Sequence, residues 1–475
     1  MRPSLLESRG AKERSGVAIC DAASGRSWTH AELEPSLASC GQWLDSDPQV
    51  VFCFCNNSVG SLFAYLTCFE RGVPVALLDG SLDDGFRNEL VDRYRPKFIV
   101  APRDVAFDPA LYAPAGAEIE DSMVWRRRED RTVEIHPELA VLLPTSGTTG
   151  NPKFVRLSRT NVVANANSIR LGLAIQPDER AILSLPLHYS YGLSVVNSHL
   201  LAGASQVVST TSVASREFWD TAKTYAVTSM AGVPYTYQML RRLGLNKVAP
   251  ASLRTLTQAG GRLSPELIRE FHQLMTDRDG RFFVMYGQTE ATARIAIVPA
   301  ERLSDKIGSA GLPVEGGSIL ILDDAGNKVG TGEQGEIVYE GPNVMLGYAE
   351  RPEDLALGDV MRGRLHTGDL GYLDADGFLF ITGRASRFAK VFGLRVNLDD
   401  IEKLATGGRA VAAIAGDDRV IVFAEGAPEQ SLGELRAALA RKLQVHATAF
   451  DIRAIERLPL LTSGKVDYKA LQRLK

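Results

Sequence analysis

Strand-like and helix-like segments alternate early in this 475-residue chain, and this order strongly restricts what it can fold into. An apolar run at 50–55 reads as a buried strand, residues 59–71 as a helix closed by Gly72, and 73–78 as the next strand. Strands that alternate with helices predict parallel pairing in an α/β layer architecture. The length exceeds that of one ordinary core, so we expect at least two domains.

The composition is that of an ordinary globular protein, with 45% hydrophobic and 23% charged residues. The net charge of −4 does not indicate the excess of basic residues that is typical of nucleic-acid-binding proteins. No apolar stretch is long enough to span a membrane, and the first residues carry charges where a signal peptide is apolar. The five cysteines form no CxxC pattern, which indicates reduced thiols, no zinc site and a cytoplasmic location.

The C-terminal part reads as a separate small α+β unit. Residues 371–383 form a hairpin pattern with a turn at 375–377. Beyond it we expect strands and one helix, at 410–414, 420–424 and 450–455 for the strands and 432–443 for the helix. We therefore predict a large domain over 1–384, a small domain over 385–475 and a hinge at 384–387.

The strongest local signal is the Gly-, Ser- and Thr-rich segment 145–153, which follows an apolar strand at 140–143. Its glycines let backbone N–H groups turn inward, and its hydroxyls and lysine add donors and charge for an anion such as phosphate. A polar hairpin loop is the alternative reading. The segment is not a Walker A loop, because Lys153 does not directly follow Gly150 and a strand follows at 154–157.

Four further segments carry residue types suited to nucleotide chemistry. Paired glycines at 260 and 261 permit close approach of a flat ligand, and 285–291 supplies an aromatic ring, a hydroxyl and a carboxylate. The carboxylate of Asp369 suits ribose hydroxyls. The last segment places Lys465 after a glycine on a terminal loop, where an ammonium group can reach into a cleft.

Together, these five motifs resemble in type and order those of the adenylate-forming superfamily, which includes acyl-CoA and aryl-CoA synthetases, nonribosomal adenylation domains and luciferases. The resemblance covers nearly the whole chain. It implies an α/β fold, with a large N-terminal domain of layered sheets and helices and a small mobile C-terminal α+β domain. It also implies ATP-dependent activation of a small-molecule carboxylic acid to acyl-AMP with release of pyrophosphate. Transfer to a thiol follows, and ATP, Mg²⁺ and CoA, or the phosphopantetheine of a carrier protein, are the implied cofactors.

The resemblance also implies roles for individual residues. Phosphates are expected against Thr145, Ser146, Gly147, Thr148, Thr149, Gly150 and Lys153. Adenine is expected beside Gly260, Gly261 and Tyr286. Ribose is expected beside Asp369, with Arg384 as a second contact to ribose or phosphate. Thr289 is expected to contact the α-phosphate, Glu290 to bind Mg²⁺ and Lys465 to catalyse adenylation. The acid pocket is expected at His188, Tyr189 and Gly287, the hinge at Ser386 and the pantetheine path at Gly393.

The sequence departs from the family pattern at three points. Phe154 follows Lys153 where the family usually has Gly, Ser386 stands at the hinge in place of Asp, and His188–Tyr189 replaces Phe-His. Amino-acid-activating relatives carry an Asp where this chain has Tyr189, and acetate-activating relatives carry a Trp where it has Gly287. The resemblance therefore predicts a larger acyl or aryl acid and a pocket floor left open by Gly287.

Two alternative functions remain open at this stage. A stand-alone acyl-AMP ligase that loads an acyl carrier protein would share every motif. A phosphotransferase or ATPase built around the Gly-rich loop would instead release ADP.

Overall fold

The fold was analysed in a computed structural model of the chain. The structure describes residues 3–6, 15–45, 47, 49–129, 133–145, 153–384, 387–391, 394–405, 409–416, 419–443, 446–461 and 464–475. These residues divide into two compact units. The first comprises Met1–Ser318 and Tyr339–Leu365, and the second comprises Ile319–Val338 and His366–Lys475.

One sheet of the first unit has nine strands in the order β16-β15-β14-β13-β12-β10-β11-β1-β2. Its centre is parallel and its edges are antiparallel. The strands are β1 Val17–Asp21, β2 Ser27–Thr29, β10 Arg180–Ile182, β11 Ser205–Val208, β12 Ser229–Gly232, β13 Thr255–Gln258, β14 Arg281–Tyr286, β15 Ala296–Ile297 and β16 Leu312–Pro313.

A second sheet has eight strands in the order β19-β9-β8-β4-β3-β5-β7-β6, again with a parallel centre. The strands are β3 Val51–Cys55, β4 Val75–Asp79, β5 Phe98–Pro102, β6 Tyr112–Ile119, β7 Ser122–Arg127, β8 Leu139–Thr145, β9 Lys153–Ser158 and β19 Gly347–Ala349.

The first unit's helices are α2 His30–Cys40, α3 Val59–Arg71, α4 Asp84–Tyr94, α5 Arg159–Gly172, α6 Ser190–Ala202, α7 Arg216–Thr224, α8 Pro234–Leu243, α9 Leu245–Val248 and α10 Pro265–Thr276.

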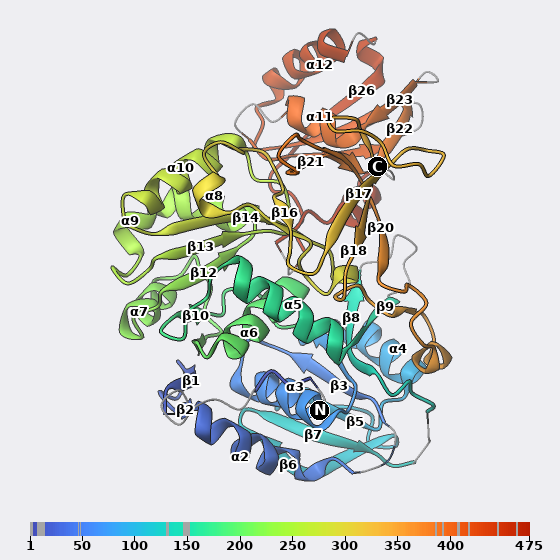
Figure 1. Cartoon of the computed structure of the whole chain (residues 1–475). Helices are drawn as coiled ribbons and strands as arrows, with labels where there is room; N and C mark the ends of the chain where they lie inside the picture. Colours follow the sequence, from blue (N-terminus) through green and yellow to red (C-terminus); the bar gives the residue numbers. More distant parts are fainter. Residues whose placement is uncertain are drawn as a thin grey trace. The chain divides into compact units, whose positions relative to one another are not determined.

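Helices α5 and α6 lie between the two sheets (Figure 1), which makes the first unit a layered structure. Helix α5 packs on β8 and β9, and α6 packs on β10 and β11. The Ser158 hydroxyl caps α5 by accepting from the Asn161 N–H, while the Asn161 side chain accepts from Ser158 N. This packing places the N-terminal end of α6, which carries the predicted acid-pocket segment, at the carboxyl end of the parallel strands.

The second unit contains most of a four-stranded sheet and two small sheets. The four-stranded sheet has the order β17-β18-β20-β21, with β17 Ser318–Leu322, β18 Gly335–Glu340, β20 Arg364–Leu373 and β21 Leu379–Arg384. The small sheets are β22-β23 and β24-β25-β26, with β22 Phe388–Val391, β23 Leu394–Asn397, β24 Val411–Ala415, β25 Val420–Glu425 and β26 Phe450–Ile455. The helices are α11 Leu398–Ala405, α12 Glu429–Leu443 and α13 Tyr468–Arg473.

The predicted elements agree with the structure. The helix expected at 59–71 is α3 with the same bounds, the hairpin at 371–383 is β20–β21, and the four C-terminal elements are β24, β25, α12 and β26. The α/β class is confirmed. The predicted domain boundary at 384–387 falls inside the second unit, between β21 and β22, and stays a prediction.

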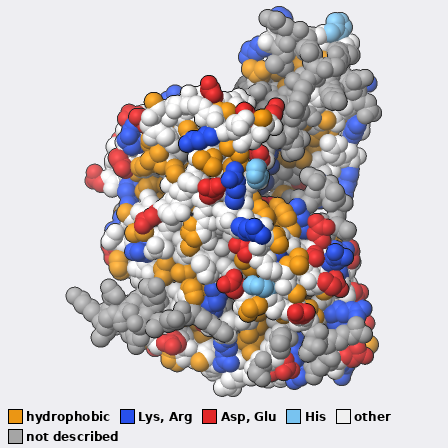
Figure 2. All heavy atoms as spheres, turned by 45° about the vertical axis from the view of Figure 1, so that its right-hand side comes forward, with side chains coloured by type: hydrophobic (Ala, Val, Ile, Leu, Met, Phe, Trp, Pro, Cys, Tyr) orange, Lys and Arg blue, Asp and Glu red, His pale blue; other side chains and the backbone are white. Residues whose placement is uncertain are grey.

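The state of the cysteines and the distribution of surface charge are the next features that the composition bears on. All five cysteines are free thiols, and four of them are buried. On the face shown in Figure 2, acidic and basic side chains are interspersed rather than gathered by sign. None of the described helices combines the length and the apolar character needed to cross a lipid bilayer.

Candidate active site

The predicted phosphate loop connects two paired antiparallel strands. Thr145 ends β8 and Lys153 begins β9, and the two residues face each other in the ladder. The Thr145 hydroxyl donates to the Lys153 carbonyl at 3.3 Å, which closes the loop at its base. Of the seven predicted phosphate-binding residues, five (Ser146, Gly147, Thr148, Thr149 and Gly150) lie outside the described residues.

Lys153 and Glu290 meet on the same tyrosine, which the sequence analysis did not identify. The Lys153 ammonium lies 3.5 Å from the centroid of the Tyr348 ring, and the Tyr348 hydroxyl donates to Glu290 Oε1 at 2.8 Å. Strand β19 brings Tyr348 here because it pairs with β9. Burial, together with the neighbouring Glu290 carboxylate, raises the pKa of Tyr348, so the hydroxyl keeps its proton for this hydrogen bond.

The Glu290 carboxylate is suited to holding a Mg²⁺ ion beside phosphates. Its Oε1 atom accepts from Tyr348, whereas Oε2 accepts from none of the described residues. A hard carboxylate oxygen with a free lone pair is a typical Mg²⁺ ligand when phosphates supply the others. The described residues contain no cluster of three or more His, Cys, Asp and Glu that would form an all-protein metal site.

Thr289 lies at the N-terminal end of α6. Its hydroxyl is 3.1 Å from the Ser190 hydroxyl. Thr289 begins the short 3-10 helix Thr289–Ala291, which ends where Thr292 takes a left-handed backbone with φ of 62°. The Thr292 hydroxyl holds that turn by donating to the Asn343 carbonyl at 2.7 Å. The turn therefore holds the Thr289 and Glu290 side chains in a defined geometry, in which both can contact a ligand.

The predicted adenine and acid-pocket segments are in contact. Gly260 has a φ of 83°, and a Cβ atom added to it would lie 2.4 Å from the Tyr189 hydroxyl oxygen. Only glycine permits both this conformation and this approach. Burial raises the pKa of Tyr189, so its ring presents a neutral hydroxyl. Tyr286, the predicted stacking residue, accepts a hydrogen bond from Gln288 Nε2 at 3.3 Å.

His188 lies near the carboxylate of Asp79, the last residue of strand β4 in the eight-stranded sheet. Its Nε2 atom is 3.6 Å from Asp79 Oδ2. Burial lowers the pKa of His188, an effect that Asp79 partly opposes. The imidazole is therefore mainly neutral near pH 7 and takes a positioning rather than a charged role.

Gly287 is packed closely against neighbouring backbone. A Cβ atom on Gly287 would lie 1.7 Å from the Ala293 carbonyl oxygen and 2.9 Å from the Cα atom of Arg294. The chain after the 3-10 helix folds back against this glycine, so backbone fills the space. Gly287 is needed for that close approach, and its role in leaving the pocket floor open stays a prediction.

Asp369 and Arg384 are paired within the second unit. They face each other across β20 and β21, and Arg384 Nε donates to Asp369 Oδ1 at 3.1 Å. The Asp369 side chain is 5% exposed and that of Arg384 is 58% exposed. A buried carboxylate held by an exposed guanidinium is a fixed acceptor, as ribose recognition requires.

Lys465 lies at the end of a tight loop in the second unit. Leu461 and Lys465 are joined by a backbone hydrogen bond of 2.8 Å, and Gly464 adopts a φ of 75°. The residue is exposed, as expected of a side chain that acts from a terminal loop. Two further predicted positions, Ser386 at the hinge and Gly393 on the pantetheine path, lie outside the described residues.

A cavity lies behind the acid-pocket segment in the first unit. Its volume is about 20 Å³, and α5, α6 and strands β12 to β14 enclose it. Its lining is mainly apolar, with Glu179, His199 and Arg294 as ionisable groups. Sequence reasoning missed all three. Arg294 left a signal, since it is the one charge in the apolar run 291–298.

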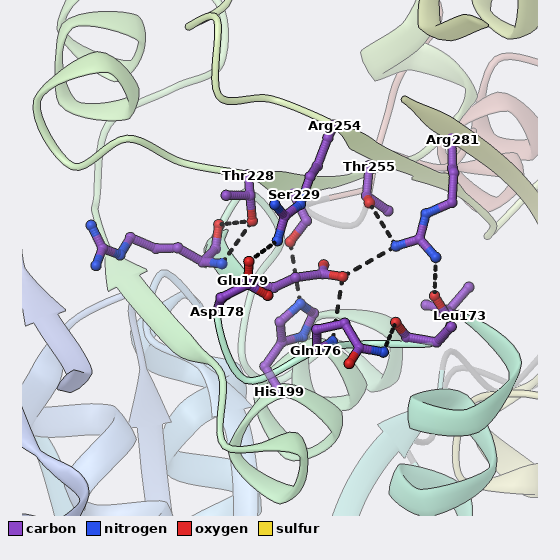
Figure 3. A network of polar contacts seen from close by, with 12 residues as sticks. Leu173, Gln176, Asp178, Glu179, His199, Thr228, Ser229, Arg254, Thr255 and Arg281 are labelled. Atoms are coloured by element: carbon purple, nitrogen blue, oxygen red, sulfur yellow. Dashed lines mark hydrogen bonds and ion pairs between the residues drawn. The ribbon is translucent and has the colours of Figure 1, made fainter. Parts of the chain in front are cut away.

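Several polar residues that line this cavity belong to a network in which they contact one another (Figure 3). Glu179 is 1% exposed and accepts from Arg281 at 3.1 Å, and Arg281 also donates to the Leu173 carbonyl at 3.0 Å. His199 Nε2 is 3.2 Å from the Ser229 hydroxyl. Burial lowers the pKa of His199 to about 4, so the ring is neutral.

Comparison with known proteins identifies relatives of the same architecture. The family described as "AMP-binding enzyme" matches residues 6–349. A feruloyl-CoA synthase of Amycolatopsis sp is 29% identical over 426 residues, covering 87% of this chain and 84% of that protein. The 2-succinylbenzoate–CoA ligase of Bacillus licheniformis is 33% identical over 335 residues, covering 70% and 68%. The o-succinylbenzoate CoA synthetase (MenE) of Bacillus subtilis, solved with its acyl-adenylate intermediate, superposes with a TM-score of 0.78 at 24% identity, covering 99% and 98%.

The fold is therefore that of the adenylate-forming enzymes, with a layered α/β body and a small C-terminal α+β portion. The chain belongs to the family of AMP-binding enzymes. It is an AMP-forming acid–thiol ligase, which activates a carboxylic acid with ATP to an acyl-adenylate and then transfers the acyl group to a thiol.

Proposed function

We propose that the chain joins a carboxylic acid larger than acetate to coenzyme A, in the cytoplasm, with the residues of the candidate site in the roles that follow. The convergence of Lys153 and Glu290 on Tyr348 carries the proposal, because it sets a cation and a metal-binding carboxylate beside the loop expected to hold phosphates.

In the first half-reaction, the acid's carboxylate attacks the α-phosphorus of ATP and pyrophosphate leaves. Lys153 and the donors of 145–150 bind the leaving phosphates, and Thr289 orients the α-phosphate from its place beside Ser190. Glu290 would hold the Mg²⁺ ion, which neutralises phosphate charge when bound. Lys465 stabilises the negative charge that builds up during attack.

Different residues are proposed for the adenine and for the ribose of the nucleoside. Gly260, Gly261 and Tyr286 form the surface for the adenine ring, with Gly260 as the position of close approach. Asp369 accepts from the ribose hydroxyls, and Arg384 fixes that carboxylate. Arg384 keeps an exposed guanidinium whose remaining N–H groups can donate to a ribose or phosphate oxygen.

In the second half-reaction, the small domain rotates at Ser386 and presents Gly393 to the thiol. The contacts of Arg387, just after this hinge, support a rotation of the small domain as one rigid body. It donates to Glu402 at 2.7 Å and pairs with Asp399 at 2.7 Å, both on α11. The residue after the hinge is therefore anchored to the small C-terminal sheets and helices and would move with them.

The relatives favour CoA over a carrier protein as acceptor, since the two reported above are named for CoA thioesters. Their acids are an aromatic monocarboxylate in one case and an aromatic dicarboxylate in the other. A free α-amino acid does not fit this chain, because the acid-pocket segment offers Tyr189 and no carboxylate to pair with an ammonium group.

The test is a screen of pyrophosphate release over acetate, hexanoate, dodecanoate, benzoate, cinnamate and the proteinogenic amino acids, with and without CoA. We expect acid-dependent formation of AMP and pyrophosphate, and a thioester only with CoA. The ranking of kcat/KM should put a larger acid first. Formation of ADP and phosphate would contradict the reaction, a first rank for acetate or an amino acid would contradict the pocket, and thioester formation only on a carrier protein would contradict the acceptor.

A further inference from the structure

Arg294 is a fully buried arginine in the wall of the cavity behind the acid-pocket segment. Only 2% of the residue is exposed. Tyr191 and Ser194 of α6 line the same cavity, as do Met230 and Thr257 from the sheet. A guanidinium in such a place loses its hydration, and burial accordingly lowers the pKa of Arg294.

The backbone of Arg294 is held firmly in this position. Asn165 of α5 donates to the Arg294 carbonyl at 3.0 Å and accepts from its N–H at 3.3 Å. Asn343 donates to the same carbonyl at 2.9 Å. The Arg294 Cα atom also lies close behind Gly287. The guanidinium therefore projects from a fixed base.

The guanidinium has no counter-charge among the described residues. Its carbon lies 4.6 Å from the centroid of the Tyr191 ring, and its one hydrogen bond is a long contact of 3.5 Å to the Ser194 hydroxyl. The Nε atom is buried with no acceptor. Glu179, the acidic residue lining the same cavity, already pairs with Arg281 (Figure 3).

A buried arginine without a carboxylate costs stability, so its presence needs an explanation outside the free protein. The buried carboxylate of Glu179 in the same cavity, by contrast, is paired with Arg281. Arg294 differs in that its N–H groups are oriented by Tyr191 and face a small cavity. A planar guanidinium with open N–H groups matches a carboxylate in a two-pronged contact.

We propose that Arg294 binds a second carboxylate on the acid substrate, so that the enzyme activates a dicarboxylic acid. This inference rests on the proposed function. The cavity volume of about 20 Å³ exceeds the roughly 10–15 Å³ that one water molecule needs, so the cavity has room for a small polar group and not for a long alkyl chain. The substrate's anionic end exchanges its hydration for the Arg294 N–H groups and the Ser194 hydroxyl.

A chain of neighbouring side chains connects the lining of this cavity with the candidate reaction centre. The Tyr191 ring, which stacks on Arg294, has its centroid 6.2 Å from that of Tyr189. Tyr189 in turn abuts Gly260, and Ser190 between the two tyrosines contacts Thr289. In the proposed complex, the acid lies along the N-terminal turn of α6, with one carboxylate near Thr289 and the other at Arg294.

The first experiment compares wild type with Arg294→Met, Arg294→Lys and the control Arg254→Met. Arg254 lies in the same unit, pairs with Asp178 at 2.8 Å and does not line the cavity. The substrates are pairs of mono- and dicarboxylic acids with the same chain of four to eight carbons, plus benzoate and its 2-, 3- and 4-carboxy derivatives. The readout is kcat/KM for pyrophosphate release at saturating ATP and Mg²⁺.

We expect wild type and Arg254→Met to prefer a dicarboxylic acid. Arg294→Met should lose about 10- to 100-fold on that acid and change little on the matched monocarboxylic acid. Arg294→Lys should retain part of the preference. A wild type that ranks a monocarboxylic acid first, or an unchanged ratio in Arg294→Met, overturns the inference and leaves the proposed function intact.

The second experiment measures thermal unfolding without ATP, which needs no turnover. The preferred dicarboxylic acid should raise the Tm of wild type and not that of Arg294→Met. Without acid, Arg294→Met should be at least as stable as wild type, since it removes an uncompensated charge. A Tm several degrees lower for Arg294→Met, with the acid shift retained, identifies Arg294 as a structural residue and overturns the inference.

Discussion

The Tyr348 hydroxyl donates to Glu290 Oε1 at 2.8 Å, from a strand that pairs directly with the one carrying Lys153. This hydrogen bond fixes one carboxylate oxygen and leaves the other for Mg²⁺. It also places the Lys153 ammonium over the same ring, 3.5 Å from its centroid. The cation and the carboxylate of the proposed phosphate site are thus oriented by a single residue that no motif contains.

Tyr348→Phe should raise the Mg²⁺ concentration needed for half-maximal pyrophosphate release by about tenfold. The ring and its contact with Lys153 remain, whereas a hydrogen bond to a charged group is lost. A Mg²⁺ titration at fixed ATP measures the effect. Tyr372→Phe, which removes a hydroxyl from the hairpin of the second unit, is the control. An unchanged Mg²⁺ requirement in Tyr348→Phe would show that Glu290 does not act through the metal.

Lys465→Ala should abolish adenylation while largely sparing thioester formation from preformed acyl-AMP. The loss of one focused charge contact in a transition state costs about 3–4 kcal/mol, or 10²–10³ in rate. Stopped-flow assays of the two half-reactions measure the difference. Lys469→Ala is the matched control, since this exposed lysine lies four residues further on. Equal loss in both half-reactions would refute a lysine used in one conformation only.

Gly393→Leu should have the opposite effect, blocking thioester formation and sparing ATP–pyrophosphate exchange. A side chain at this position would obstruct a thin pantetheine arm that passes close to the backbone. Gly433→Leu serves as control, because a Cβ atom there meets nothing within 4 Å. A collapse of exchange together with thioester formation would mean that the path is assigned to the wrong loop.

Gly287→Ala should destabilise the protein, because its Cβ atom would lie 1.7 Å from the Ala293 carbonyl oxygen. Overpacking against backbone typically costs about 1–3 kcal/mol. Chemical denaturation measures the free energy of unfolding, with Gly433→Ala as a helix-compatible control. A Gly287→Ala variant as stable as wild type would contradict this close approach of backbone to Gly287.

The stability should fall as the pH drops from about 6.5 towards 4, in part through His199. Burial lowers the pKa of His199 to about 4 in the folded state, below its ordinary value of 6.5. The unfolded chain therefore binds the proton first, and protonation favours unfolding by up to about 3 kcal/mol. Nearby Glu179 has its pKa raised by burial and acts in the opposite direction.

The measurement compares the free energy of unfolding at pH 7 and pH 4.5 in wild type and His199→Gln. The glutamine amide can keep a hydrogen bond to Ser229 but does not titrate, so the variant should lose less stability on acidification. The Glu179 contribution is common to both proteins and cancels. Equal pH dependence in the two proteins would show that folding does not shift the pKa of His199.

The local helices, strands and turns could be predicted because the residues that indicate each of them lie close together in the sequence. The helix at 59–71 has a serine cap at Ser58 and ends at Gly72 with φ of 74°, and both are visible in the sequence. The turn at 375–377 and the strands around it are equally local. Gly260 was predicted as a position of close approach for a flat ligand, which stays a prediction, and in the structure the Tyr189 hydroxyl lies against this glycine.

The sequence by itself determined the motifs, their order and the local elements that carry them, because hydrophobic periodicity, caps and turn residues act over a few positions. Only the tertiary structure decided which distant residues meet. Strand β19 reaches β9 from nearly 200 positions away, which brings Tyr348 to Lys153 and Glu290. The backbone behind Gly287 and the burial of Arg294 likewise depend on helices α5 and α6 packing between two sheets, and no local pattern encodes that packing.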